Sequence, residues 1–218
     1  MAERYELIVF DWDGTLMDSA AAIVAAILAA SRDLNMPEPS EERARHVIGL
    51  GLADALRYAV PELAVADYPR MAERYRHHYL AKDRELTLFP GAYEMIAELS
   101  EAGCMLAVAT GKSSLGLQRA LEHSRLGNFF HATRCADQCF SKPHPAMLEE
   151  IMDELGVARD RTLMVGDTTH DLQMARNAGV RGLGVAFGAH PRPHLEAESP
   201  VAVVGTPAEL AAWLRANA

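Results

Sequence analysis

The chain of 218 residues is 50% hydrophobic and 23% charged, a composition that can fill a buried core and that excludes an intrinsically disordered protein. Its formal net charge of −9 at pH 7 argues against a nucleic-acid-binding role that depends on broad phosphate contacts, so we expect no nucleic-acid partner. The length suits one large domain, or a core domain with a smaller companion.

The cysteines and the N-terminus indicate a cytoplasmic protein. Cys104, Cys135 and Cys139 form neither a disulfide framework nor a Cys-x-x-Cys motif, and we interpret them as reduced thiols. The chain runs from Met1 directly into an apolar, strand-like segment, so we expect no signal peptide. The longest apolar run, residues 20–30, is too short and too rich in alanine to span a bilayer, so we expect no membrane partner. The sequence leaves the oligomeric state open.

Apolar runs that are typical of buried strands alternate with helical patterns over most of the chain. The strand-like runs cover residues 6–10, 104–109, 162–165, 182–187 and 201–204, with a weaker candidate at 130–136. Helical patterns cover residues 93–102, 114–123, 145–155, 171–178 and 207–217. This alternation predicts an α/β fold with a Rossmann-like, mainly parallel sheet flanked by helices.

The segment from residue 17 to residue 86 breaks this alternation. Asp18 and Ser19 can cap a helix that ends before Pro37, and further helical patterns follow at residues 40–48, 52–60 and 68–83. A long helical stretch between the first and second strands predicts a separate helical domain, residues 17–86. We expect a core domain made of residues 1–16 and 87–218.

Two carboxylates follow the first strand. Asp11 comes directly after an apolar run, and Asp13 lies two residues further on, before Gly14 and Thr15. The carboxyl end of such a strand is where open α/β sheets place their ligand crevice. Two acids crowded there repel each other unless a cation or a proton neutralises one of them. Mg²⁺ fits such a site because it binds one or two carboxylates together with substrate phosphate.

Later strand ends carry further polar residues. Thr110 can hydrogen-bond a phosphoryl oxygen and Gly111 lets backbone amides approach it, although Thr-Gly after a strand is also common without function. Lys142 is one of only three lysines and could neutralise a phosphoryl group. Asp167 follows the run 162–165, and Asp171 lies at the next helix start, where it can also serve as the N-cap.

The run Phe10-Asp11-Trp12-Asp13-Gly14-Thr15-Leu16 resembles the first motif of the haloacid dehalogenase-like superfamily, whose members are mostly Mg²⁺-dependent phosphatases. The later motifs resemble the family's other motifs in type and order, and the layout is similar to its phosphoglycolate phosphatase-like branch with a helical cap. The resemblance implies that Asp11 is the nucleophile that forms an aspartyl-phosphate. It implies that Asp13 is the general acid and base, and that its backbone carbonyl binds the metal. Trp12 departs from the pattern, where an aliphatic residue is more usual.

The resemblance also assigns the remaining core positions. It implies that Thr110, Gly111 and Lys142 bind the phosphoryl group, that Asp167 completes the Mg²⁺ shell with Asp11, and that Asp171 holds Lys142 or a metal-bound water. Two neighbours lie outside the family pattern: we expect Lys112 on the surface or rim of the site, and His170 at the edge of the crevice.

Substrate specificity is expected from the helical segment, because the core residues contact only the phosphoryl group. The loop Gly49-Leu50-Gly51-Leu52 either reaches into the site, as in related proteins, or is a plain turn between helices. Arg45, with His46 and Arg57, flanks this loop and could bind an anionic substrate tail, although each could equally be solvated.

We therefore predict a phosphomonoester hydrolase that acts on a small phosphorylated metabolite and requires Mg²⁺. A phosphosugar mutase of the same superfamily remains an alternative, because it shares all the motifs. A phospho-acceptor signalling domain is the alternative from another class, although such domains are shorter and have no helical insertion after the first strand.

Overall fold

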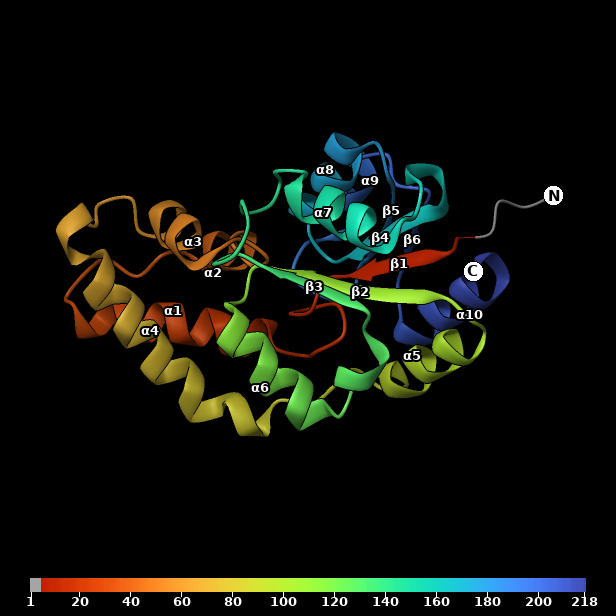
Figure 1. Ribbon diagram of the computed structural model, residues 1–218. Coiled ribbons are helices and arrows are strands. Elements are labelled where there is room, and N and C mark those ends of the chain that lie inside the picture. The colour runs from red at the N-terminus through yellow and green to blue at the C-terminus, as the bar shows by residue number, and fades with distance from the viewer. Residues whose placement is uncertain (1–4) are drawn as a thin grey trace.

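The computed structural model describes residues 5–218 and has a single six-stranded sheet at its centre (Figure 1). All the neighbouring strands are parallel, in the order β3-β2-β1-β4-β5-β6. The strands are β1 (Leu7–Phe10), β2 (Met105–Thr110), β3 (Ala132–Cys135), β4 (Thr162–Gly166), β5 (Arg181–Val185) and β6 (Ala202–Val204). The expected α/β fold with a parallel sheet is therefore confirmed.

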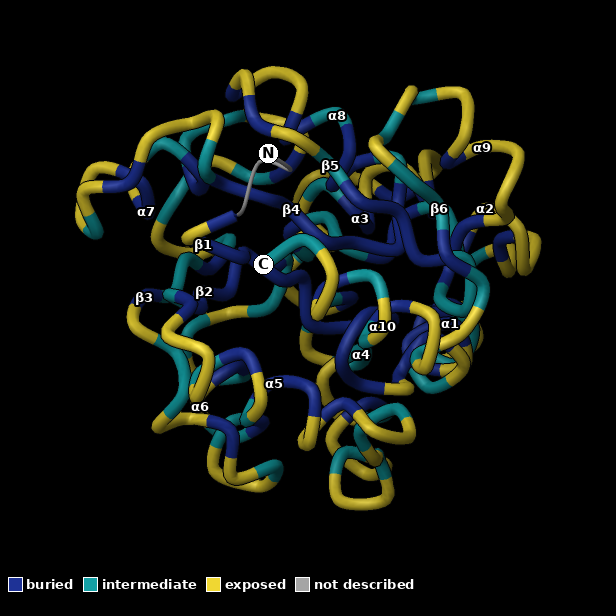
Figure 2. The backbone as a smooth tube through the Cα atoms, turned by 90° about the vertical axis from the view of Figure 1, so that its right-hand side faces the viewer, coloured by how far each residue is buried: buried dark blue, intermediate teal, exposed yellow. Residues whose placement is uncertain are grey.

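Strand β1 lies between β2 and β4, and every one of its residues is buried. A strand that is covered on both faces is apolar at every position, which explains its continuous apolar run. Its side chains point alternately to two cores: Ile8 and Phe10 belong to one, Leu7 and Val9 to the other. Figure 2 shows the central strands as the most continuously buried part of the chain.

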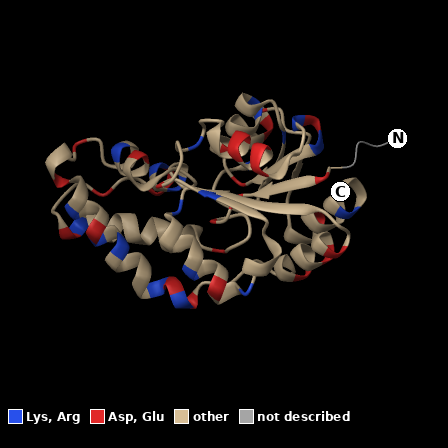
Figure 3. Ribbon diagram, viewed as in Figure 1, with Lys and Arg blue, Asp and Glu red and all other residues tan. Residues whose placement is uncertain are grey.

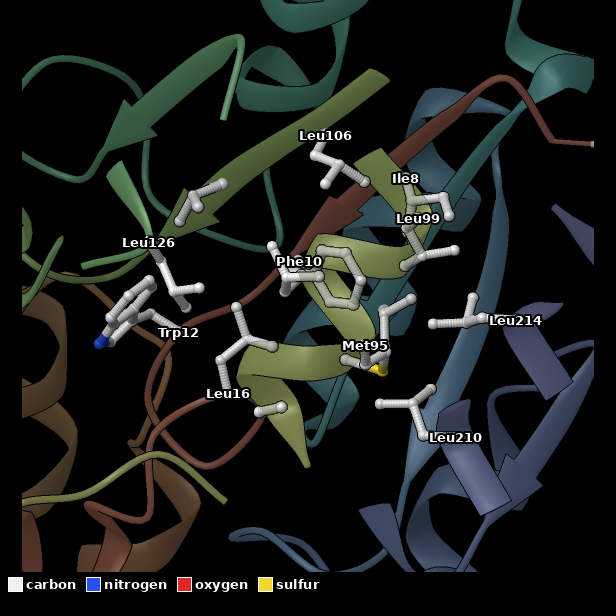
Figure 4. Close-up of a cluster of buried hydrophobic side chains, with 14 of the residues drawn as sticks. Ile8, Phe10, Trp12, Leu16, Met95, Leu99, Leu106, Leu126, Leu210 and Leu214 are labelled. Carbon is white, nitrogen blue, oxygen red and sulfur yellow. The ribbon is translucent and has the colours of Figure 1, made fainter. Parts of the chain in front are cut away.

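Helices cover both faces of the sheet. On the Phe10 face, apolar residues of α5, α6 and α10 complete the core, and Figure 4 shows Met95, Leu99, Leu210 and Leu214 around the Phe10 ring. On the opposite face, α7 and α8 supply the core residues. The bounds of these helices are α5 Ala92–Glu101, α6 Ser114–Ser124, α7 Ala146–Leu155, α8 Thr169–Ala178 and α10 Pro207–Asn217.

The first four α-helices of the described chain form a group with its own apolar cluster. They are α1 (Ala20–Asp33), α2 (Glu41–His46), α3 (Leu52–Ala59) and α4 (Tyr68–Lys82). Figure 1 shows them together at the end of the sheet toward which β1 points. The chain leaves and returns side by side, since the amide of Asp18 donates to the carbonyl of Thr87 (3.0 Å) and that of Phe89 to the carbonyl of Leu16 (2.9 Å).

Most of the expected elements are present within a few residues of their predicted bounds, and three details differ. Ser19 precedes α1 without capping it, because its hydroxyl donates to Asp13 instead. Thr168, not Asp171, is the N-cap of α8, and Asp171 is the third helical residue of a capping box. The short helix α9 (Arg192–Ala197) was not predicted from the sequence.

The surface carries both signs of charge. Figure 3 shows Lys and Arg interspersed with Asp and Glu along the outer helices. Among residues 5–218, we find no helix with the length and apolar character that crossing a membrane requires. Four short 3-10 turns connect the larger elements: Val65–Asp67, Asp83–Glu85, Gly127–Phe129 and Arg159–Arg161.

Candidate active site

The strand ends bring the predicted core residues to one edge of the sheet. Asp11 directly follows β1, Thr110 ends β2, and Asp167 directly follows β4, so three neighbouring strands each present a polar side chain there. All three residues have no solvent-exposed surface. Because parallel strands end on the same side, residues that are far apart in the sequence meet at this edge.

Lys142, in the loop between β3 and α7, joins two of the acids. Its Nζ donates to Asp11 Oδ1 and to Asp171 Oδ1, each at 2.6 Å, and the lysine side chain is fully buried. The other oxygen of Asp171 accepts from the hydroxyl (2.7 Å) and the amide (3.0 Å) of Thr168. These hydrogen bonds fix the Asp171 carboxylate, so Lys142 is held against Asp11 by a residue of α8.

Asp167 is fixed from two other segments. Thr15 Oγ1 donates to its Oδ1 at 2.9 Å, and the amide of Ala189 donates to its Oδ2 at 2.7 Å. Gly14 makes this close approach possible: its φ is +87°, and a Cβ at this position would collide with the Asp167 carboxylate. The Asp-Gly-Thr part of the first motif therefore has a direct structural cause.

The electrostatics of this cluster favour a cation. Burial, opposed by Lys142 and reinforced by Asp171 and Asp167, raises the pKa of Asp11 well above its usual range. Burial, with the charge of Asp171, raises the pKa of Asp167 to about 7. Burial alone would lower the pKa of Lys142, but Asp11 and Asp171 outweigh it and the pKa is raised, so the lysine stays charged.

These residues fit a divalent metal ion. Three carboxylates and one ammonium leave a buried net charge of −2 when all are ionised, which is the charge that Mg²⁺ would balance. Oxygens of Asp11, Asp167 and Asp171 lie within 4.8 Å of one another. Asp11 Oδ2 is buried and has no hydrogen-bond partner among the described residues, so it is the acceptor that a metal ligand set would use.

Asp13 points away from this cluster and toward the helical group. Its Oδ1 accepts from Ser19 Oγ (2.7 Å) and from Lys112 Nζ (3.0 Å), and its Oδ2 lies 3.1 Å from the same Nζ. Lys112 Nζ also donates to Tyr79 Oη of α4 at 2.8 Å. The Asp13 carboxylate therefore contacts residues of the helical group and Lys112, and not the cluster of Asp11, Lys142 and Asp171.

A cavity of about 470 Å³ opens beside Asp13, between the sheet edge and α1, α3 and α4. Gly49 lines it, with a φ of +88°, and so does Gly111. A Cβ at Gly111 would collide with the backbone of Gly49 and Leu50. The loop between α2 and α3 thus lies directly on the end of β2.

The structure brings together most, but not all, of the predicted site residues. Asp11, Thr110, Lys142, Asp167 and Asp171 lie at the sheet edge, and Gly49, Gly111 and Asp13 line the neighbouring cavity. Arg45 does not line this cavity, and its Nε pairs with Glu41 Oε1 at 3.1 Å. Arg57 pairs with Asp54 in the same way, at an exposed position.

Lys112 and His170 are less exposed than their predicted positions implied. The Lys112 side chain is only 9% exposed because it pairs with Asp13. His170 is 7% exposed and belongs to a cluster with His46 and His190, in which both its Nε2 (2.7 Å) and that of His190 (3.2 Å) face the backbone carbonyl of His46. Burial lowers the pKa of His170 and that of His190, the latter to about 4, so this cluster is uncharged near neutral pH and packs the helical group onto α8.

Several contact residues of the site were missed in the sequence. Thr15, Ser19, Tyr79 and the amide of Ala189 all bond the site carboxylates or their partners. Of these residues, only Thr15 could have been recognised as a site residue from the sequence, because it belongs to the first motif. Trp12, the departure from that motif, is fully buried and packs edge-to-face on Phe130 (6.4 Å), next to Leu126 in Figure 4.

Comparisons with known proteins agree with this fold and site. A family model for haloacid dehalogenase-like hydrolases matches residues 8–185. The chain is 40% identical over 212 residues to "Probable phosphatase IndB" of Dickeya dadantii, covering 94% of this chain and 91% of that protein. It is 33% identical over 203 residues to a phosphoglycolate phosphatase of Agrobacterium fabrum, covering 90% and 87%. A hydrolase structure from Pseudomonas syringae superposes with a TM-score of 0.89 at 25% identity, covering 98% of each chain.

The chain therefore belongs to the haloacid dehalogenase-like hydrolase family. Within that family it falls in the phosphoglycolate phosphatase-like branch, and it is an enzyme of the phosphatase class.

Proposed function

We propose that this protein hydrolyses small phosphomonoesters with Mg²⁺ as cofactor, through a covalent intermediate on Asp11. The observation that carries this proposal is the fully buried Asp11 carboxylate, with one oxygen held by Lys142 and the other without a partner. Such an acid is oriented for attack and needs a cation beside it. Mg²⁺, held by Asp11, the backbone carbonyl of Asp13 and Asp167, would lower the repulsion between the phosphate dianion and these carboxylates.

The chain's own residues divide the remaining work. An oxygen of Asp11 attacks phosphorus, the bond from phosphorus to the ester oxygen breaks, and Asp13 gives its proton to the leaving alcohol. Asp13 then takes a proton from the water that hydrolyses the aspartyl-phosphate, which regenerates both acids and releases phosphate. Lys142 and Thr110, with the backbone at Gly111, bind the phosphoryl oxygens, and Asp171 positions Lys142.

We infer a two-domain organisation for this activity. Residues 17–86 would form the helical cap, and residues 1–16 with 87–218 the catalytic core, although residues 1–4 lie outside the described residues. The separate apolar cluster of α1–α4 and the paired linkers near Met17 and Leu88 support this division. The cytoplasmic location expected from the sequence stays a prediction.

Phosphate release and active-site trapping test the proposal. The purified protein is incubated with Mg²⁺ or with EDTA and a set of small phosphomonoesters, and we expect release only with the metal. Borohydride reduction of the acid-quenched enzyme should convert the phosphorylated residue to homoserine at position 11. Asp11→Asn should abolish both signals, whereas Asp18→Asn, at an exposed position of the same segment, should abolish neither. Release by Asp11→Asn, or a label elsewhere, would refute the nucleophile assignment.

The alternatives have less support. A phosphosugar mutase must bind the hydroxyl groups of a sugar, whereas nine of the residues that line the cavity beside Asp13 are Ile, Val or Leu. A phospho-acceptor domain has no counterpart of the helical group, and the matching relatives are named as phosphatases.

A further inference from the structure

The cavity beside Asp13 is the space that a leaving group would occupy. Asp13 and Gly111 line it, and in the sequence they lie within two residues of Asp11 and Thr110, the proposed nucleophile and a proposed phosphoryl-binding residue. At about 470 Å³, the cavity falls in the size range of sites that bury whole organic ligands, about 300–1,000 Å³. A two-carbon leaving group such as glycolate would fill only a small part of it.

Apolar side chains line most of this cavity, together with the charged residues Asp13, Arg76, Lys112, Arg119 and Asp137. One wall is formed by the side chains of Ile23, Ile27, Val47, Ile48, Leu50 and Leu56. Tyr75 and Tyr79 of α4 also line the cavity, and their rings stack at 5.8 Å. Leu80 and Leu115, which also line the cavity, are 43% and 62% exposed, so its outer part is apolar as well. Exposed apolar side chains around a hollow are typical of a binding site.

Three basic residues line the cavity: Lys112, Arg76 and Arg119. Lys112 pairs with both oxygens of Asp13, so it is not free to bind a second carboxylate. Arg119 Nε lies 3.8 Å from Asp83 Oδ2 and makes no hydrogen bond among the described residues, and Arg76 is exposed on α4.

We propose that the preferred substrates are phosphomonoesters whose leaving group is large, uncharged and predominantly apolar, held between α1, α3 and the stacked tyrosines of α4. The inference rests on the proposed phosphatase function and adds the chemical class of the leaving group. Burial of the leaving group in the cavity stabilises the transition state in proportion to the apolar area removed from water.

A series of unbranched alkyl phosphates tests this directly, because their leaving alcohols have nearly the same acidity. The ratio kcat/KM is measured with Mg²⁺ for ethyl, butyl and hexyl phosphate, with 2-phosphoglycolate as the small anionic comparison. We expect kcat/KM to rise about threefold to fourfold for each added methylene, and so on the order of 100-fold from ethyl to hexyl. The kcat/KM for hexyl phosphate should exceed that for 2-phosphoglycolate.

A matched pair of variants locates the effect. Ala53 lines the cavity from α3 but is exposed, so Ala53→Trp fills the space without crowding a packed core. Ala66→Trp, at an exposed position away from the cavity, is the control. Ala53→Trp should flatten the chain-length series, lowering kcat/KM more for hexyl phosphate than for ethyl phosphate, and the control should keep the full slope at the same thermal midpoint.

The outcomes separate the two proposals. A flat series, or 2-phosphoglycolate hydrolysed better than hexyl phosphate, overturns the apolar leaving group but leaves the phosphatase proposal intact. If Ala53→Trp lowers kcat/KM by the same factor for every ester, the assignment of this cavity to the leaving group is overturned. If Mg²⁺ supports hydrolysis of no ester, the proposed function fails and this inference fails with it.

Discussion

Replacing Asp167 with asparagine should stabilise the metal-free protein, and more so at high pH. Burial and Asp171 raise the pKa of Asp167 from 3.8 to about 7, so the folded state binds this proton more tightly than the unfolded state does. The contribution of this group to the free energy of unfolding is therefore greatest below about pH 4 and is lost as the pH rises to about 7. A pKa difference of about 3 corresponds to about 4 kcal/mol.

The substitution should keep the local geometry. An asparagine oxygen can accept from the amide of Ala189 while its NH₂ donates to the hydroxyl of Thr15, which can turn to accept. Without the charge, we expect a gain of about 4 kcal/mol at pH 8 and about 2 kcal/mol at pH 5, relative to the parent protein. Urea unfolding in EDTA, followed by tryptophan fluorescence, measures both values.

The difference between variant and parent reports Asp167 together with Asp11, whose pKa the Asp167 charge raises, and cancels the titrations that Asp167 does not affect. His190, with a burial-lowered pKa of about 4, acts in the opposite direction, because its contribution to stability is lost as the pH falls below about 6.5. That term is the same in both proteins and cancels. Added Mg²⁺ should stabilise the parent and not Asp167→Asn. A gain that is equal at pH 5 and pH 8, or a loss at both, would contradict the reasoning.

Three further substitutions test neighbouring contacts. Lys142→Met leaves buried carboxylates without their cation, so urea unfolding in EDTA should show a loss of about 3–5 kcal/mol, and an unchanged midpoint would argue against the ion pairs. Gly111→Ala adds a Cβ against the backbone of Gly49, and should lower the free energy of unfolding by about 1–3 kcal/mol and raise KM. Unchanged stability and KM would show that the loop between α2 and α3 does not contact Gly111. Because Lys112 pairs with Asp13, Lys112→Met should lower kcat about 10- to 100-fold, whereas Lys82→Met, at an exposed lysine, should not. Equal kcat values for Lys112→Met and the parent protein would exclude a role for Lys112.

The sheet and the phosphoryl end of the site could be predicted because both follow from local patterns. A parallel strand buried on both faces is a continuous apolar run, and Asp11, Thr110 and Asp167 directly follow or end such runs. Since parallel strands end at one edge, three separate short motifs predicted one cluster.

Contacts made across the chain could not be predicted in this way. Tyr79 approaches Asp13 from 66 residues away, and nothing in the amphipathic pattern of α4 distinguishes it from Tyr75. Ser19 precedes a helix, so the sequence predicts that its side chain caps that helix. In the structure its hydroxyl donates to the Asp13 carboxylate instead. The sequence predicted that Arg45 could bind an anionic substrate tail, but Glu41, one helical turn earlier, forms an ion pair with it.

Asp13 explains why the chemistry and the specificity of this enzyme can vary independently. The acids around Lys142 have fixed partners on every side except that of Asp11 Oδ2, so a change there disturbs the charge balance of the whole cluster. Asp13 instead takes its hydrogen bonds from Ser19 and Lys112, and its surroundings include Tyr79 of the helical group. Exchange of apolar residues in α1 or α3 would reshape the leaving-group cavity without touching the buried charges. The helical group should therefore decide which ester is cleaved, and the sheet edge should decide only that a phosphoryl group is transferred.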